Sequence, residues 1–211
     1  MCVGLLFKKA NKMKKILNII SSPRGEASVS NQLANTIITK LQARYPGSTI
    51  TTKDLVVNKY PHLEESHLEA FFAPAESDTA AYKEATRHSN DAIREVQEAD
   101  IIVIGVPLYN FSLPSGLKAW IDHLVRRQKT FTYSNGKPEG LLKGKKVYLA
   151  IASGGIYSDG PMKSFDYAEP YLKFILGFIG ITDITTYRAE GLNVPGLQET
   201  ALQKGIESVT V

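Results

Sequence analysis

The chain has 211 residues, of which 43% are hydrophobic and 22% charged, and its formal net charge is +4. Those values are typical of one globular domain and exclude a disordered, collagen-like or coiled-coil protein. No apolar run approaches the roughly 20 residues of a membrane span, and the small, scattered charge excess does not indicate nucleic-acid binding. The single cysteine, Cys2, can form neither an internal disulfide nor a structural zinc site, which favours a reduced, cytoplasmic setting.

The amino terminus places a short apolar patch before its lysines, the reverse of the order in a secretory signal. We therefore expect residues 1–13 to form a disordered leader, with Met13 as an alternative initiator. No internal repeat or low-complexity linker divides the remainder, so residues 14–211 are expected to form a single domain.

Strand and helix patterns alternate along this domain. Short β-branched apolar runs predict strands at 16–20, 49–57, 99–106, 146–152 and 183–189. Apolar residues at three- and four-residue spacing predict helices at 28–45, 82–97, 115–125, 169–180 and 196–209, with a further short helix within 58–77. The alternation predicts an α/β fold, a doubly wound five-stranded parallel sheet with helices on both faces.

The loop at 21–30 follows the first strand and leads directly into a helix. Ligands of doubly wound sheets bind beyond the carboxyl ends of the strands, where the free N–H groups of a helix N-terminus accept phosphate. Ser22, Ser28 and Ser30 offer hydroxyl donors for such a ligand; alternatively, Ser28 or Ser30 only caps the helix. The loop lacks the Gly-Lys-Ser/Thr of a P-loop and the three spaced glycines of a dinucleotide fingerprint. It therefore favours a mononucleotide phosphate held by serines.

Two further loops leave the same end of the sheet. After the third strand, Tyr109 and Phe111 flank Asn110, and exposed aromatic rings at this position favour a flat ligand that covers them. Asn110 adds a donor and an acceptor for a heteroaromatic ring, although the aromatic side chains could instead fill the core. After the fourth strand, Gly154 and Gly155 allow close backbone approach to a ligand, or form a plain tight turn. Together the three loops predict one ligand crevice.

Several segments also match a known family in order and spacing. They are SSPRGEASVSNQL at 21–33, PLYNFSLPSGLKAWID at 107–122, TFTYSNGKPEGLLKGKK at 130–146, ASGGIYSDGP at 152–161 and FILGFIGITD at 174–183. Over residues 13–209 the chain resembles the FMN-dependent NADH-azoreductases, which also act as quinone reductases. The resemblance implies a flavodoxin-like fold and a single FMN-binding domain.

The resemblance also implies which residues bind the cofactor. The FMN-binding positions are Ser22, Ser28, Val29, Ser30, Leu108, Tyr109, Asn110, Phe111, Ser153, Gly154 and Gly155. The chain has Ala-Ser-Gly-Gly where the family often has Ser-Arg-Gly-Gly, so the choice between NADH and NADPH stays open. Tyr157 stands where relatives often have histidine, and Tyr157 and Tyr133 are expected to stack on the substrate.

The implied activity is an NAD(P)H oxidoreductase that reduces quinones by two electrons and cleaves azo compounds reductively. Donor and acceptor use one pocket in turn, which predicts ping-pong kinetics, and no catalytic side chain is expected because the flavin N5 carries the hydride. The family implies a homodimer in which each chain completes its neighbour's site. The alternatives are a flavodoxin-type FMN electron carrier, which would usually be acidic, and a flavin-free regulatory protein on the same fold.

A metal site is not expected. The four histidines lack the spacing and the acidic neighbours of a set of metal ligands: His62, His67, His88 and His123. Trp120 lies at helical spacing among apolar residues and is expected in the core or at a subunit interface.

Overall fold

The central sheet contains five parallel strands in the order β2-β1-β3-β6-β7. Its strands are β1 Lys15–Ile20, β2 Thr49–Asp54, β3 Ile101–Pro107, β6 Lys146–Ala152 and β7 Asp183–Ala189. The computed structural model describes residues 12–74 and 77–211, so most of the expected 1–13 leader lies outside the described residues. The strand order reverses between β1 and β3, and this topology confirms the expected doubly wound sheet.

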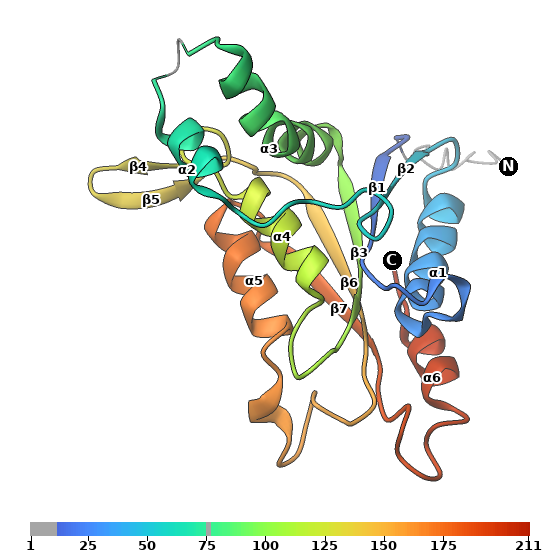
Figure 1. Cartoon of the computed structure of the whole chain (residues 1–211). Coiled ribbons are helices and arrows are strands. Elements are labelled where there is room, and N and C mark those ends of the chain that lie inside the picture. Colours follow the sequence, from blue (N-terminus) through green and yellow to red (C-terminus); the bar gives the residue numbers. More distant parts are fainter. Residues whose placement is uncertain (1–11, 75–76) are drawn as a thin grey trace, which may run out of the picture.

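Helices cover both faces of the sheet (Figure 1). They are α1 Val29–Arg44, α2 Glu65–Phe72, α3 Ala80–Glu98, α4 Ser115–Leu124, α5 Glu169–Phe178 and α6 Ala201–Ser208, with short 3-10 turns η1 Gly25–Ala27 and η2 Lys163–Phe165. One face carries α1 and α6, and the opposite face carries α3, α4 and α5, with α2 packed on α3. None of the helices within the described ranges combines the length and apolar character needed to cross a membrane.

Alternate residues of each inner strand point to opposite faces and so feed two separate cores. On β3, Ile102 and Ile104 pack in the core beneath α3, α4 and α5, whereas Ile101 and Val103 pack beneath α1 and α6. Every residue of β3 is buried, as its continuous apolar sequence predicts, while β2 at the sheet edge is mostly exposed and rich in threonine. Trp120 is buried in the first of these cores, which confirms the core alternative.

Gly105 of β3 brings the start of α1 against the sheet. A Cβ atom there would lie 3.3 Å from the Asn31 side-chain oxygen and 3.5 Å from the Ser30 carbonyl oxygen. The Ser21 hydroxyl donates to the Gly105 carbonyl oxygen at 2.6 Å. The N-terminus of α1 is therefore fixed at the point where the strand order reverses.

Two local features differ from the sequence prediction. Residues β4 Phe131–Ser134 and β5 Lys137–Gly140 form an antiparallel hairpin, which was not predicted. Its turn is Asn135-Gly136 with φ of 52° and 75°, and this dipeptide is a strong hairpin signal that could have revealed it. The last helix begins at Ala201 rather than at 196, because the preceding residues form hydrogen-bonded turns instead.

Candidate functional site

The structure brings the three candidate loops together at the carboxyl ends of β1, β3 and β6, the lower end of the molecule in Figure 1. The Ser22 hydroxyl lies 3.4 Å from the Tyr109 hydroxyl, which joins the first loop to the second. The rings of Phe111 and Tyr157 meet edge to face, with centroids 6.1 Å apart, which joins the second loop to the third. The expected convergence of these loops is therefore present in the fold.

The first loop forms what we call the serine end, made of Ser22, Ser28, Ser30 and the first turn of α1. Ser28 is the N-cap, because its hydroxyl accepts from the Asn31 amide at 3.3 Å, and it lies 3.0 Å from the Ser30 hydroxyl. All three serines are buried. Capping therefore explains Ser28 in part, but Ser30 lies inside the helix and does not act as its cap.

Unpaired backbone groups remain at the serine end. The amides of Val29 and Ser30 have no hydrogen-bond partner among the described residues. These N–H groups lie at the positive end of the α1 dipole, with the equivalent of about half a unit charge. The serine end thus offers amide and hydroxyl donors to an anion, and a phosphate group is the ligand that such sites commonly take.

The second loop forms the aromatic end, which is the tight turn Tyr109–Ser112 together with the cavity beside it. Tyr109 and Ser112 exchange two backbone hydrogen bonds of 3.0 and 2.9 Å, so Asn110 and Phe111 are the central residues of a two-residue turn. Both have positive φ, 48° and 66°, which is uncommon for residues with side chains and marks a strained turn.

This turn leaves two backbone donors unpaired. The amides of Asn110 and Phe111 have no hydrogen-bond partner among the described residues. Tyr109 and Phe111 are 36% and 44% exposed, so the alternative in which they fill the core is wrong. The turn therefore combines two free donors with exposed aromatic surface, as a binding site for a flat heteroaromatic ring requires.

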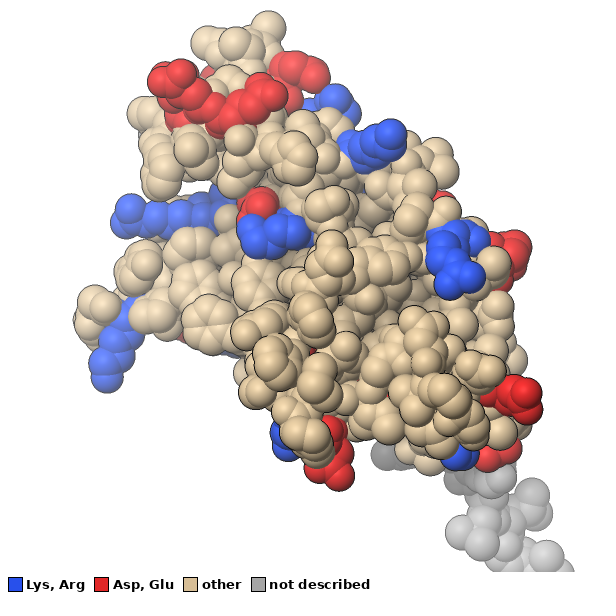
Figure 2. Space-filling view, turned by 60° about the horizontal axis from the view of Figure 1, so that its bottom comes forward, with Lys and Arg blue, Asp and Glu red and all other residues tan. Residues whose placement is uncertain are grey.

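A cavity of about 1330 Å³ opens beside the turn. Leu108, Tyr109 and Asn110 line one side of it, segment 55–62 forms a second wall, and Tyr171 of α5 contributes to a third. No Asp or Glu lies among the described residues that line the cavity. Seen from this end, much of the surface is uncharged (Figure 2). The cavity is large enough for stacked planar ligands.

The third loop is held by the segment that follows β7. The backbone amides of Gly191, Leu192 and Asn193 donate to carbonyl oxygens of the third loop at 2.9 to 3.2 Å. A Cβ atom on Gly154 would lie 2.5 Å from the Asn193 side-chain nitrogen, so a larger residue there would have to displace the Asn193 side chain. Ser153 is buried and donates to the Gly155 carbonyl oxygen at 2.9 Å.

These contacts bear on the role predicted for the third loop. The close approach of Asn193 gives Gly154 a packing role that needs no ligand. Ser153, Gly154 and Gly155 do not line the cavity, and neither do Ser22, Ser28, Ser30 and Phe111. Their part in cofactor binding remains a prediction. The amides of Gly154 and Gly155 have no partner among the described residues and stay available as donors.

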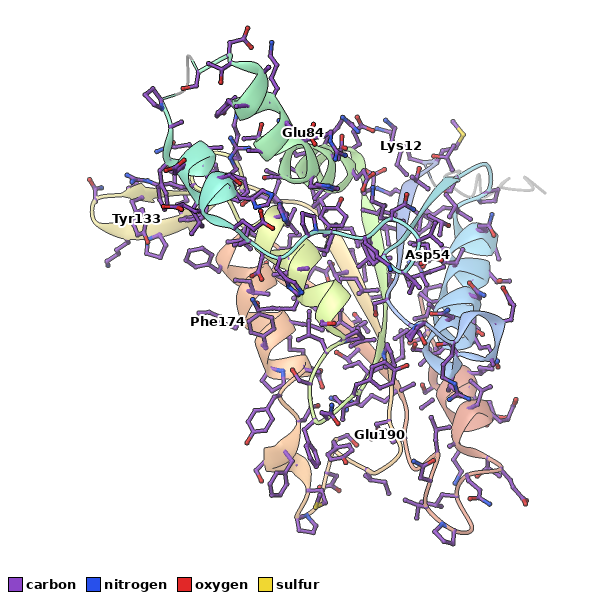
Figure 3. All side chains as sticks on the ribbon, in the orientation of Figure 1. Lys12, Asp54, Glu84, Tyr133, Phe174 and Glu190 are labelled. Carbon is purple, nitrogen blue, oxygen red and sulfur yellow. The ribbon has the colours of Figure 1, made fainter. Side chains whose placement is uncertain are left out.

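The two tyrosines predicted to stack on a substrate lie in different places. Tyr157 contacts Phe111 beside the aromatic end. Tyr133 is 53% exposed on the β4–β5 hairpin, at the other end of α5 from the loop that contains Glu190 (Figure 3). Within one chain, therefore, Tyr133 does not belong to the site.

A cluster of histidines behind the cavity wall was not predicted as a group. The ring of His123 lies with its centroid 5.1 Å from that of His67 and 5.8 Å from that of His88. The His123 Nε2 atom lies 3.0 Å from the Pro61 carbonyl oxygen, in the segment that forms the wall. The three residues belong to different helices, so only the tertiary fold unites them.

Burial controls the electrostatics of this cluster. Desolvation lowers the pKa of His123 and of His88 below the ordinary histidine value. In the part of the chain that the structure describes, no group of three or more His, Cys, Asp or Glu is arranged to hold a metal ion. The His123 Nε2–H group donates to the Pro61 carbonyl oxygen and so ties α4 to segment 55–62.

Comparisons with known proteins agree with this geometry. A family model described as a flavodoxin-like fold matches residues 14–210. An FMN-dependent NADH:quinone oxidoreductase of Herminiimonas arsenicoxydans is 47% identical over 180 residues, which cover 85% of this chain and 88% of that protein. A protein of the same name from Beijerinckia indica subsp. indica is 43% identical and covers 93% of this chain and 98% of its own length.

Solved structures give the same result. The crystal structure of an azoreductase from Bacillus anthracis has a TM-score of 0.85 and 31% identity, and covers 92% of this chain and 96% of that one. An FMN-dependent NADH-azoreductase from Bacillus anthracis, solved in complex with FMN, has a TM-score of 0.81 and 29% identity, with 92% and 94% coverage. The chain belongs to the flavodoxin-like family that includes the FMN-dependent NADH:quinone oxidoreductases.

Proposed function

We propose that the protein is an FMN-dependent NADH:quinone oxidoreductase that also cleaves azo compounds reductively. The observation that carries this function is the pairing of two sets of unpartnered amides, Val29 and Ser30 at the serine end and Asn110 and Phe111 at the aromatic end. The contact between Ser22 and Tyr109 links the two ends. A ligand with a phosphate at one end and a flat heteroaromatic ring at the other suits this arrangement, and FMN is such a ligand.

The serine end would hold the phosphate of FMN. The hydroxyls of Ser28 and Ser30 lie 3.0 Å apart at the first turn of α1, and Ser22 belongs to the loop that leads into this turn. The α1 dipole adds an attraction for negative charge that needs no charged side chain. The fit favours FMN over riboflavin, which lacks the phosphate.

The aromatic end would hold the ring. FMN, when bound, supplies the hydride and two-electron chemistry. The amides of Asn110 and Phe111 are fixed by the tight turn, so they are preorganised to stabilise negative charge at the edge of the ring. The Asn110 side chain adds both a donor and an acceptor.

The cavity would receive NADH and then the acceptor. Its lining is mostly apolar and aromatic, and no carboxylate lines it among the described residues. Planar nicotinamide, quinone and azo groups can each bury against such walls, which exclude water from the reacting face. One cavity for both partners requires that the first leave before the second enters, hence ping-pong kinetics.

We also infer a homodimer located in the cytoplasm. Exposed aromatic side chains support the dimer: Phe174 is 69% exposed, Tyr167 59% and Tyr133 53%. Covering Phe174 and Tyr167 with a second copy would remove apolar area from water, and the neighbour's hairpin would then bring a Tyr133 to the cavity. The single cysteine agrees with a reducing compartment.

Two measurements test the function. Addition of FMN to the purified protein, followed by gel filtration, is expected to leave a yellow complex with a flavin absorbance spectrum. Anaerobic stopped-flow mixing with NADH is then expected to bleach the flavin, and a quinone or an azo dye to restore it. A colourless protein would contradict flavin binding, whereas a flavin that neither NADH nor NADPH bleaches would favour the electron carrier.

A further inference from the structure

Arg188 of β7 lies largely out of contact with solvent among three carboxylates. Its guanidinium forms ion pairs with Asp166 and Glu169 through Nη2, and with Glu190 through Nη1 at 3.1 Å. The side chain of Arg188 is 12% exposed, and those of the three acids between 5% and 18%. We call these four residues the Arg188 network.

Two of the acids fix segments that approach the aromatic end. Glu190 accepts from the Tyr157 amide at 2.8 Å and from the Ser158 amide at 3.0 Å. Asp166 accepts from the Ala168 and Glu169 amides at 2.9 and 3.0 Å, at the start of α5. Each carboxylate thus bridges Arg188 and the backbone of a different loop.

Those loops carry aromatic side chains that surround Phe111. The Phe111 ring lies with its centroid 6.1 Å from that of Tyr157 and 5.9 Å from that of Phe165. The Phe111 carbonyl oxygen accepts from the Tyr167 amide at 3.0 Å. The strained turn at Phe111 is therefore held between two segments, and an acid paired with Arg188 contacts each of them.

The network carries a surplus of negative charge. Its three carboxylates face Arg188 and one lysine, Lys173, which pairs with Glu169 at 2.7 Å. Burial raises the pKa of Glu169, but hydrogen bonds from Lys173, Thr186 and Arg188 outweigh it and lower the pKa to about 2. Buried ion pairs of this kind contribute little net stability, because desolvation offsets their attraction. Stability alone is therefore a poor reason for so many buried charges at one place.

We propose that Arg188 is a positioning residue that, through Glu190 and Asp166, holds Tyr157 and Phe165 against Phe111 and so fixes the turn whose neighbouring residues Asn110 and Ser112 line the cavity for planar reactants. The proposal rests on the proposed function. The phosphate of FMN would bind at the serine end, so loosening this turn affects the reactants in the cavity more than the affinity for FMN.

Glu190→Gln is the main test, since it keeps the shape and an acceptor oxygen but removes the charge that Arg188 attracts. We expect kcat/KM for a neutral naphthoquinone to fall about tenfold, with the Kd for FMN changed less than threefold. Glu84→Gln breaks an exposed ion pair with Arg87 on α3 and serves as the matched control, with no expected effect. Arg188→Lys, which retains the charge but not the fork, is expected to be less impaired than Arg188→Met.

A double-mutant cycle with Tyr157→Ala separates positioning from general destabilisation. If Glu190 acts through Tyr157, then Glu190→Gln/Tyr157→Ala is no more impaired than Tyr157→Ala alone. The proposal would be overturned if the loss of kcat/KM in the double variant equalled the product of the losses in the two single variants. It would also be overturned if Glu190→Gln left kcat/KM unchanged.

A second readout does not depend on activity. In the protein without added flavin, hydrogen exchange of a peptide containing Tyr157 and Ser158 is expected to rise at least tenfold in Glu190→Gln but not in Glu84→Gln. Unchanged exchange would overturn the proposal. If the wild-type protein reduces no acceptor while exchange responds as expected, the proposed function fails and the positioning of the loop stands.

Discussion

The serine end and the aromatic end of the site are built on opposite plans. The serine end consists of small, buried hydroxyls and backbone amides at a helix N-terminus, and Ser28 and Ser30 contact one another directly. The aromatic end consists of exposed rings on a strained turn beside a wide cavity, and histidines and ion pairs support it from behind. The donor groups of the serine end are in place without a ligand, whereas the aromatic end exposes apolar surface that a ligand would cover.

This contrast assigns different physics to the two ends. Attraction between a doubly charged phosphate and a helix N-terminus is electrostatic and specific to the phosphate. Stacking on Tyr109 and Phe111 depends on buried area and is indifferent to the phosphate. Comparing FMN with riboflavin, which shares the ring alone, therefore measures each end separately.

The largest expected effect is a selective loss of phosphate binding in Ser30→Asp. The new carboxylate would lie among the donors of the serine end and repel the phosphate, and we expect FMN to bind about 100-fold more weakly, a cost of about 2.7 kcal/mol. Riboflavin affinity should change little. Titration calorimetry with both ligands checks this, and Ser30→Ala controls for the loss of the hydroxyl. Equal weakening of both ligands would show that the two ends are not separable.

At the aromatic end, Asn110→Ala is expected to weaken FMN and riboflavin alike, by about tenfold or about 1.4 kcal/mol. The change removes the side-chain donor and acceptor and places a Cβ-bearing residue without a local hydrogen-bonding group at φ of 48°. Asn110→Gly tolerates this φ and so isolates the side-chain contribution. Unchanged affinity for both ligands in Asn110→Ala would contradict the role given to the turn.

The sheet could be predicted because its strands are buried on both faces. β3 and β6 are continuous apolar runs, and each lies between two segments with a helical pattern. A run of this kind predicts a buried parallel strand. The hairpin β4–β5 was not predicted because its strands have only four residues each, are partly or fully exposed, and lack a clear apolar face. Its Asn135-Gly136 turn was the usable signal.

The site could be predicted only where its functional residues lie together in one loop. The serines and the Tyr109–Phe111 turn stand out because each group is contiguous in sequence. Arg188 and the acids that surround it are separated by up to 22 residues, and the histidines belong to three helices, so no local pattern unites them. Such clusters exist only once the tertiary fold has formed.

The cluster of His67, His88 and His123 behind segment 55–62 is expected to make stability depend on pH. His123 is buried, and its pKa in the folded protein lies below its value in the unfolded chain. The unfolded state therefore binds more protons as the pH falls below about 6.5, so stability is full above this pH and declines towards the folded-state pKa. The charged and titratable neighbours are His67, His88 and Asp122.

Replacing His123 by Phe is expected to flatten this decline between pH 7 and pH 5. The contribution removed is about 1.4 kcal/mol for each unit by which the two pKa values differ. Urea unfolding at several pH values measures it. His88→Gln should act in the same direction but less, because His88 is the more exposed of the two. A wild-type stability that does not change over this range would show that the histidine cluster does not link folding to proton binding.

The smallest expected effect concerns charge at the mouth of the aromatic end. Lys59 lines the cavity and has no ion-pair partner among the described residues, whereas Lys118, which also lines it, is paired with Asp122 at 2.5 Å. An acceptor that carries a sulfonate should therefore gain more from Lys59 than from Lys118. We expect Lys59→Ala to lower the kcat/KM ratio of a naphthoquinone sulfonate to the parent naphthoquinone about threefold, as befits a solvent-exposed charge.

The ratio is the quantity to measure, because the two quinones differ in reduction potential and that difference is the same for every variant. The double variant Lys118→Ala/Asp122→Ala is the matched control and should change the ratio less, because it removes a whole ion pair and leaves the net charge unchanged. Added salt should reduce the wild-type ratio towards that of Lys59→Ala. A ratio that neither Lys59→Ala nor salt affects would mean that charge at the aromatic end does not select the acceptor. Only the serine end would then recognise its ligand by electrostatic attraction.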